Sequence, residues 1–260
     1  MKVLILPDAQ AAVARAADII ADIVTKKPDA VLGLATGGTM LPLYDVLAQR
    51  HRDSGLSFAQ TASFNLDEYI GLAPEHPCSY HYYMEDVFFR RVDIDPSRTH
   101  LPKGNTDDPH AASEAYEALI EEAGGIDLQL LGIGQNGHIG FNEPTASLGS
   151  RTRVKTLTDS TRRANQTYFA SFDETPRYAI TTGVATILDS RKCLLLATGA
   201  AKAEAVAKMI EGPLSAACPA SALQLHARAT IVLDRDAANA LALMDYYETV
   251  HPEGQPSAFD

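Results

Sequence analysis

Short apolar runs alternate along the chain with longer segments whose apolar residues recur at helical spacing. The short runs are rich in Val, Ile and Leu, which is typical of parallel strands that are buried on both faces. The predicted strands are residues 2–6, 30–35, 62–66, 128–133, 192–197 and 229–233. The predicted helices are residues 8–26, 41–50, 79–91, 108–123, 183–188, 201–211 and 236–247. This alternation predicts an α/β fold: a single doubly wound, mainly parallel sheet with helices on both faces.

Two segments depart from this pattern. Residues 150–174 are polar and charged, with little core-forming periodicity. We expect them to form a lid-like excursion that packs over a binding site. Residues 251–260 contain Pro and Ser and are expected to be a loosely ordered tail after a single domain at residues 1–250.

Composition narrows the class of protein. The chain has 260 residues, 46% of them hydrophobic, enough for one large core. The formal net charge is -11, and Lys and Arg are scattered, which argues against binding of nucleic acid. Three cysteines without a Cys-x-x-Cys spacing indicate ordinary reduced thiols. The apolar run at residues 2–6 is too short for a signal peptide or a membrane span, so we expect a cytoplasmic protein without membrane contact.

The notable polar motifs each follow a predicted strand. Residues 36–39, 67–68, 132–144 and 199–202 come directly after the strands that begin at residues 30, 62, 128 and 192. In open α/β sheets, ligands bind beyond the carboxyl ends of the strands. We therefore expect one composite site that draws on all of these motifs.

Thr36, Gly37, Gly38 and Thr39 join a strand to a helix. Glycines allow the backbone to approach an anion, and the amides and hydroxyls at a helix N-terminus can bind it. The motif is either a phosphate-binding loop or simply a tight turn; it is not a P-loop, because no Gly-Lys-Ser/Thr ends it. Lys202 opens another predicted helix, from which it either meets the same anion or lies on the surface.

The other motifs contain candidate residues for acid–base catalysis. Asp67 and Glu68 follow an apolar strand, and strand alternation should direct only one of them into the site. Their alternative role is a solvated turn or a helix cap. His138 lies among glycines, with Glu143 five positions later to orient it or tune its pKa. The alternative for His138 is an ordinary core histidine.

Several other site classes are not supported. His76, Cys78 and His81 have a spacing that matches neither a helical metal pair nor a zinc-finger or metalloprotease motif. There is no Gly-x-Ser-x-Gly motif for an acyl-enzyme. We therefore expect no metal and no organic cofactor.

Five segments, in this order, resemble the glucosamine-6-phosphate deaminase family: residues 32–39 (LGLATGGT), 64–71 (FNLDEYIG), 131–144 (LGIGQNGHIGFNEP), 150–153 (SRTR) and 219–226 (PASALQLH). The resemblance extends over residues 3–238. It implies hydrolytic deamination coupled to aldose–ketose isomerisation, from glucosamine 6-phosphate and water to fructose 6-phosphate and ammonia, without a cofactor. Such a reaction belongs to amino-sugar catabolism, with a small amino-sugar phosphate as the binding partner.

The resemblance also implies roles for individual residues. His138 would assist opening of the pyranose ring, with Glu143 as its partner and Asn136 beside it. Asp67 would be the base that moves a proton between C2 and C1. The loop at residues 36–39 and Lys202 match the phosphate contacts of the family.

The chain departs from the family pattern at several positions. Asn136 replaces an Asp found in some members, which predicts a less basic His138. Thr167 stands where an Arg usually contacts the phosphate, so either Arg163 substitutes for it or the substrate differs. Met40 replaces a usual Pro, with little expected effect.

The sequence is compatible with more than one oligomeric state and more than one substrate. Arg153 and Lys155 match effector-site residues of a hexameric, allosteric branch, but the branch with Asn136 is generally monomeric or less regulated. We expect a monomer or a small homo-oligomer. The alternative functions are deamination of galactosamine 6-phosphate or another anionic amino sugar, 6-phosphogluconolactone hydrolysis, and a non-catalytic sugar-phosphate sensor.

Overall fold

The computed structural model describes residues 1–166 and 169–255. A seven-stranded sheet forms its centre, in the order β1-β10-β9-β6-β2-β3-β5, and each neighbouring pair is parallel. The strands are β1 (Lys2–Leu6), β2 (Val31–Leu34), β3 (Ala62–Asn65), β5 (Thr99–His100), β6 (Leu128–Leu131), β9 (Cys193–Ala197) and β10 (Ala229–Asp234). Except for β5, their residues are almost all buried, which explains the continuous apolar runs.

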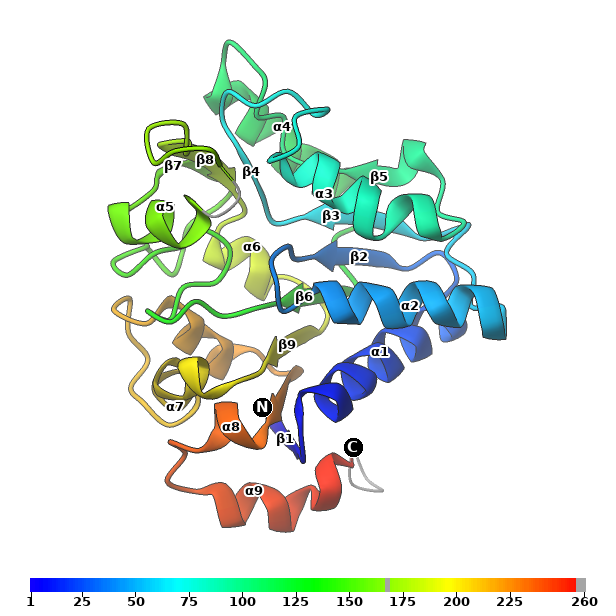
Figure 1. The fold of residues 1–260 in the computed structure, drawn as a ribbon, viewed down its shortest axis with the longest axis vertical. Coiled ribbons are helices and arrows are strands. Elements are labelled where there is room, and N and C mark those ends of the chain that lie inside the picture. The colour runs from blue at the N-terminus through cyan, green and yellow to red at the C-terminus, as the bar shows by residue number, and fades with distance from the viewer. Residues whose placement is uncertain (167–168, 256–260) are drawn as a thin grey trace.

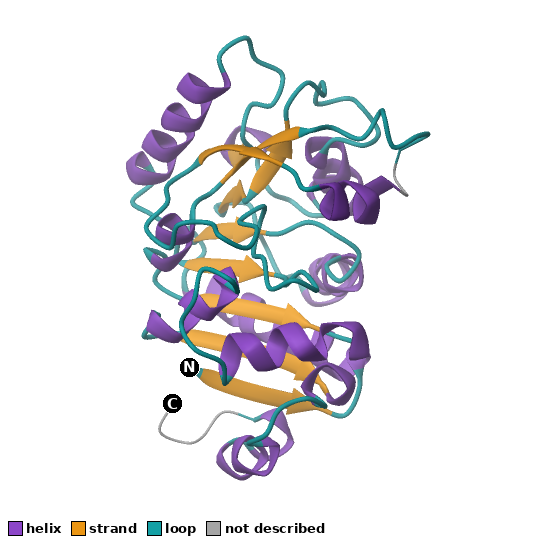
Figure 2. Cartoon of the chain, turned by 90° about the vertical axis from the view of Figure 1, so that its left-hand side faces the viewer, coloured by secondary structure: helices purple, strands orange, loops and turns teal. Residues whose placement is uncertain are grey.

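The order of the strands reverses between β2 and β6. After β2 the chain adds β3 and β5 on one side, and then β6, β9 and β10 on the other. Figure 1 shows the sheet running through the molecule, and Figure 2 shows its strands one above another with helices around them. The predicted doubly wound, mainly parallel sheet is confirmed. Its switch point, where ligands bind in such folds, is the gap between β2 and β6.

Most of the helices correspond to the segments predicted from the apolar spacing, except that α5 was not predicted. The helices are α1 (Ala9–Lys26), α2 (Leu41–Ser54), α3 (Tyr80–Val87), α4 (Pro109–Glu122), α5 (Asp159–Asn165), α6 (Val184–Leu188), α7 (Ala203–Ile210), α8 (Arg235–Ala238) and α9 (Met244–Val250). In α1, for example, Ala16, Ile20 and Val24 are buried at intervals of four, which places one face on the sheet. Asp8 caps this helix by accepting a hydrogen bond from the Ala11 amide.

A second, antiparallel sheet was not predicted. It contains β4 (Asp67–Tyr69), β8 (Tyr178–Thr181) and β7 (Arg153–Thr156), in the order β4-β8-β7. The polar segment 150–174 is therefore partly regular, since it supplies β7 and α5. The half-exposed residues of β7 carry no apolar alternation, which is why the sequence pattern does not reveal the strand.

The helix predicted at residues 236–247 is wrong as one element. It is divided into α8 and α9 because the carboxylate of Glu211 accepts hydrogen bonds from the amides of Ala242 and Leu243, which holds the backbone in a turn. Residues after α9 continue as a short 3-10 helix, η6 (Pro252–Gly254), beside β1, with His251 buried. Residues 256–260 of the predicted tail lie outside the described residues.

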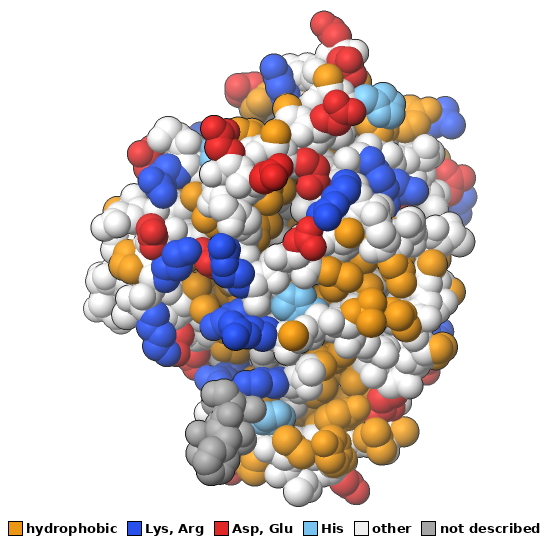
Figure 3. Space-filling model, turned by 180° about the vertical axis from the view of Figure 1, so that it is seen from behind, with side chains coloured by type: hydrophobic (Ala, Val, Ile, Leu, Met, Phe, Trp, Pro, Cys, Tyr) orange, Lys and Arg blue, Asp and Glu red, His pale blue; other side chains and the backbone are white. Residues whose placement is uncertain are grey.

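Charges of both signs occur on the surface. Seen from behind, acidic and basic side chains are interspersed over the upper part of the molecule, and hydrophobic side chains gather at the lower right (Figure 3). Among the described residues, no helix is both long and apolar enough to cross a membrane.

Candidate active site

A pocket of about 550 Å³ opens at the carboxyl ends of β2 and β6, the switch point of the sheet. Residues 35–40, Asp67, residues 132–136, His138 and Lys202 all line it. The prediction of one composite site from four separate motifs is thus confirmed, and the volume suits a small ligand. Within the described residues, no group of three or more His, Cys, Asp and Glu is placed to hold a metal ion.

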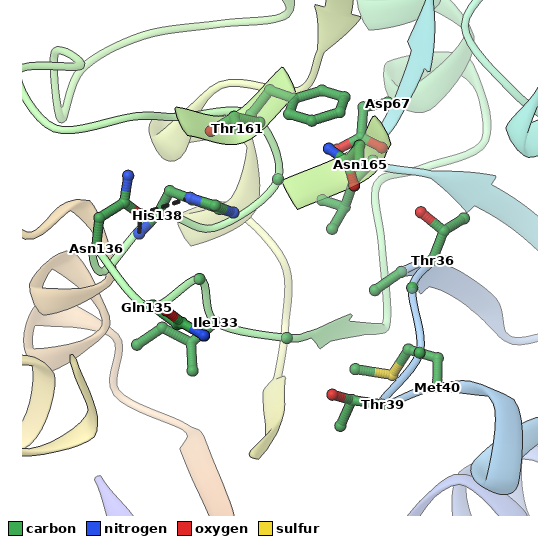
Figure 4. A pocket seen from close by; sticks show the side chains of 18 of the residues that line it. Thr36, Thr39, Met40, Asp67, Ile133, Gln135, Asn136, His138, Thr161 and Asn165 are labelled. Carbon is green, nitrogen blue, oxygen red and sulfur yellow. Dashed lines mark hydrogen bonds between the residues drawn. The ribbon is translucent and has the colours of Figure 1, made fainter. Parts of the chain in front are cut away.

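The loop from Thr36 to Thr39, Gly37 and Gly38 included, lines one side of the pocket (Figure 4). Gly37 has φ +108°, a conformation that L side chains rarely adopt. Two tyrosine hydroxyls donate to the carbonyl oxygens of this stretch: Tyr44 to Ala35 at 2.6 Å and Tyr83 to Gly37 at 2.9 Å. Because these carbonyl oxygens are already hydrogen-bonded, they repel an anion less strongly. The helix α2 starts directly after the loop without a side-chain cap, so the loop suits binding of an anion.

Lys202 enters the pocket at the end of a short 3-10 helix, η4 (Ala200–Lys202). Its ammonium donates to the Ile133 carbonyl at 2.7 Å, which leaves two of its three protons for a ligand. Burial lowers the pKa of Lys202. Both carboxylate oxygens of Asp234 accept the Gly199 amide at 3.0 Å and so fix the loop that carries the lysine.

Asp67 is buried, with 6% of its surface exposed, and it lines the pocket. Burial, and secondarily the negative charge of Glu68, raise its pKa from 3.8 to about 8. Glu68 does not line the pocket: its carboxylate accepts the amides of Tyr69, Tyr80 and His81 at 2.8–3.0 Å. The prediction that only one of the two faces the site is confirmed, and Glu68 is the helix cap of the alternative.

His138, Asn136 and Glu143 form one hydrogen-bonded group. The Asn136 side chain donates from Nδ2 to Glu143 Oε2 at 2.7 Å, and its Oδ1 lies 2.6 Å from His138 Nδ1. The acceptor on Asn136 requires a proton on Nδ1, so the neutral imidazole presents an unprotonated Nε2. Figure 4 shows the ring reaching from Asn136 into the pocket. Glu143 Oε2 is 3.7 Å from Nδ1, so the carboxylate acts mainly through the amide.

The environment of His138 favours its neutral form. Burial lowers its pKa, the charge of Lys202 lowers it further, and the charge of Glu143 opposes both. The less basic imidazole expected from Asn136 agrees with this direction, although burial is the largest cause. Gly134 is required beneath the ring, because a Cβ there would lie 2.2 Å from Cε1 of the imidazole.

Arg163, one of the two explanations considered for Thr167, is not brought to the pocket. It is exposed, and its guanidinium lies 5.8 Å from the centroid of the Phe172 ring. Thr161 and Asn165 of the same helix face the pocket, and a residue two positions from either points to the other side of an α-helix. Thr167 itself lies outside the described residues.

Sequence reasoning missed several residues that line the pocket: Tyr80 of α3, and Ser160, Thr161 and Asn165 of α5. The Tyr80 ring is tilted against that of Tyr69, at 4.9 Å between ring centroids, and the Tyr80 side chain hydrogen-bonds that of Thr36. The signal for α5 was only the Thr158 cap, which accepts the Thr161 amide at 3.2 Å. From the sequence alone, the polar face of α5 would be assigned to the solvent-exposed surface. In the folded chain this face lines the pocket.

Known proteins with similar sequences belong to one family. The model of the family described as glucosamine-6-phosphate isomerases/6-phosphogluconolactonase matches residues 8–232. The glucosamine-6-phosphate deaminase of Hahella chejuensis is 53% identical over 253 residues, 97% of each chain. That of Shewanella loihica is 51% identical over 255 residues, 98% of this chain and 95% of its own. The chain belongs to the glucosamine-6-phosphate deaminase family.

Solved structures with the same fold include both a deaminase that is similar in sequence and lactonases that are only distantly similar. A monomeric glucosamine-6-phosphate deaminase, described as a missing link of the NagB superfamily, is 50% identical with a TM-score of 0.90 and covers 92% of this chain and 100% of its own. The 6-phosphogluconolactonase of Trypanosoma cruzi is 19% identical with a TM-score of 0.74, covering 93% of this chain and 97% of its own. The lactonase shares the fold alone, whereas the resemblance to the glucosamine-6-phosphate deaminase family is confirmed.

Proposed function

We propose that this enzyme converts glucosamine 6-phosphate and water into fructose 6-phosphate and ammonia. The observation that carries the proposal is one pocket that holds a buried carboxylate, a neutral imidazole and an ammonium beside a glycine-containing loop. The reaction needs these groups: a base for carbon-bound protons, a proton carrier for oxygen, and an anion site. Relatives named for this activity, 50–53% identical over nearly the whole chain, support it.

The phosphate is held by the loop at residues 36–39 and by Lys202. Amides and hydroxyls of the loop donate to the phosphate oxygens, and the ammonium supplies charge. Charge-assisted hydrogen bonds of this kind contribute about 1.5–3 kcal/mol each. Held at this end, the sugar places its reacting carbons toward Asp67 and His138.

His138 assists opening of the sugar ring. Its unprotonated Nε2 accepts the proton of the anomeric hydroxyl and returns one to the ring oxygen. Asn136 holds the imidazole in the tautomer with an unprotonated Nε2. The negative charge of Glu143, which is hydrogen-bonded to the Asn136 amide, stabilises the imidazolium that forms between the two proton transfers. Ring opening exposes the C1 aldehyde.

Asp67 then removes the proton from C2. The bonding electrons form the C1–C2 double bond of an enolamine while the C1=O π electrons move to O1, which takes a proton from the ammonium form of the C2 amine. Asp67 then returns its proton to C1, which leaves a protonated imine at C2. Water adds to this imine, and ammonia departs to give the ketose. Burial suits Asp67 to the step, because a carboxylate with a pKa of about 8 is a stronger base than a solvated one.

The decisive experiment measures ammonia release from glucosamine 6-phosphate. Ammonia together with fructose 6-phosphate supports the proposal. Hydrolysis of 6-phosphogluconolactone without ammonia release would make the enzyme a lactonase. A higher kcat/KM with galactosamine 6-phosphate would change the epimer, and binding without turnover of any of these would indicate a sensor.

We further propose that the chain works as a monomer in the cytoplasm. A relative with a TM-score of 0.90 is described as monomeric, and the sequence contains only three cysteines, without a Cys-x-x-Cys spacing. Light scattering after size-exclusion chromatography should give a mass near 27.9 kDa. A mass of several chains would refute the monomer.

A further inference from the structure

The hydroxyl of Thr161 donates to Glu143, although it belongs to a different part of the molecule. Both side chains are buried, each with 5% of its surface exposed. Oε1 of the carboxylate accepts from Thr161, and the Thr158 hydroxyl lies 3.5 Å from the same oxygen. Oε2 accepts from Asn136 at 2.7 Å. The two oxygens therefore face different elements, one in α5 and one in the loop that carries His138.

The orientation of the Asn136 amide depends on this carboxylate. Nδ2 can donate to Glu143 only while Oε2 faces it, and this contact directs Oδ1 toward Nδ1 of His138. If the carboxylate turned away, the amide would lose the partner that sets its direction. A reversed amide would place a donor opposite Nδ1 and favour the other imidazole tautomer.

The position of Thr161 is set by the segment that covers the pocket. Arg162, buried in the same helix, donates to the carbonyls of Phe172 and Thr175 at 2.9–3.2 Å. This anchors α5 to the chain that follows it. The neighbouring Ser160 and Asn165 line the pocket, and Figure 4 shows Thr161 and Asn165 coming from α5 on the side away from Thr39.

We propose that Thr161 is a positioning residue: through its hydroxyl, α5 holds Glu143 in the orientation that fixes the Asn136 amide and the tautomer of His138. The inference rests on the proposed function for its catalytic consequence, but not for its structural one. In this role α5 is part of the catalytic centre and not only one wall of the pocket. A sugar phosphate that contacts Ser160 and Asn165 would thereby stabilise the helix that holds Glu143.

The test compares three variants. Thr161→Val keeps the shape and removes the hydroxyl, whereas Thr161→Ser keeps the hydroxyl. The matched control is Thr186→Val, which removes a buried hydroxyl that donates to Glu117 at 2.5 Å outside the pocket. We expect kcat for ammonia release to fall about tenfold in Thr161→Val, because a buried carboxylate has lost a donor, and to stay near wild type in the other two.

The pH profile separates positioning from a general loss of structure. Without the Thr161 donor, Glu143 no longer fixes the Asn136 amide beside His138, so the pH profile of kcat should shift in Thr161→Val alone. The titratable group facing Glu143 is His138 at 3.7 Å, and Lys202 acts on His138 in turn. If Thr161→Val does not fold, Thr161→Ala makes the same deletion without placing a methyl group against the carboxylate.

A substrate-free measurement completes the test. In ¹⁵N NMR spectra of the imidazole, His138 should show the Nδ1-protonated tautomer in wild type, Thr161→Ser and Thr186→Val, and a mixture in Thr161→Val. If wild type releases no ammonia but this difference appears, the proposed function fails and the positioning role stands. An unchanged tautomer and pH profile in Thr161→Val, or the same changes in Thr186→Val, would overturn the role of Thr161.

Discussion

Gly134 lies beneath the catalytic histidine, and Gly134→Ala tests how closely the site depends on the position of that ring. An added Cβ would lie 2.2, 2.3 and 2.5 Å from Cε1, Nδ1 and Nε2 of His138. The φ of Gly134 is not positive, so alanine fits its backbone, and the three atoms nearest to the added Cβ all belong to the imidazole. The substitution therefore displaces one side chain and leaves the rest of the pocket in place.

The size of the effect follows from the distances. Ordinary contact with a Cβ begins at 3.4 Å, so the ring must withdraw by about 1 Å. The bond of 2.6 Å between Nδ1 and Asn136 then lengthens beyond hydrogen-bonding distance. A misplacement of about 1 Å costs a rate on the order of 100-fold, which is about 2.7 kcal/mol of transition-state stabilisation.

Steady-state ammonia release measures this prediction. We expect kcat to fall about 100-fold and KM to change little, because residues 36–39 and Lys202 keep their places. Gly149→Ala is the matched control, since its Cβ would have only Ser147 Oγ nearby, at 3.8 Å. A Gly134→Ala enzyme with kcat within about twofold of wild type would refute the need for the observed ring position.

Further predictions concern charge. Asp67→Asn should abolish turnover and leave binding measurable, and wild-type kcat/KM should fall as the pH drops below about 8; an active variant would remove Asp67 from the mechanism. Because the pKa of Asp67 is higher in the folded protein than its usual 3.8, the folded state binds the extra proton, and stability falls as the pH rises from about 4 to 8. Asp67→Asn avoids this loss, so urea unfolding at pH 9 should show a gain of up to about 6 kcal/mol that is absent at pH 3. Lys202→Met should raise KM by roughly 10- to 100-fold through loss of a charged phosphate contact, and an unchanged KM would place the phosphate elsewhere. Arg163→Ala should leave KM unaltered, since its guanidinium lies by Phe172; an increase would show that it reaches the phosphate.

Much of the fold was predictable because its signals are local. Buried parallel strands are continuous apolar runs, and amphipathic helices repeat with their own period, so β1 (Lys2–Leu6) was predicted to the residue. Of the elements that escaped, one strand gives no local signal. The strand Arg153–Thr156 is half-exposed, and nothing in its residues distinguishes it from a loop until it pairs with β8.

The sequence by itself determined six of the seven strands of the central sheet, all but β5, as well as the family. It also determined the convergence of the polar motifs, since the carboxyl ends of parallel strands must meet at one edge. Only the tertiary structure decided which polar side chains face the pocket. Thr161 and Asn165 turn toward it while Arg163 turns away, because the placement of α5 depends on contacts with distant residues. The pKa of Asp67 was likewise beyond the sequence, since it is burial by the folded chain that makes this carboxylate a base.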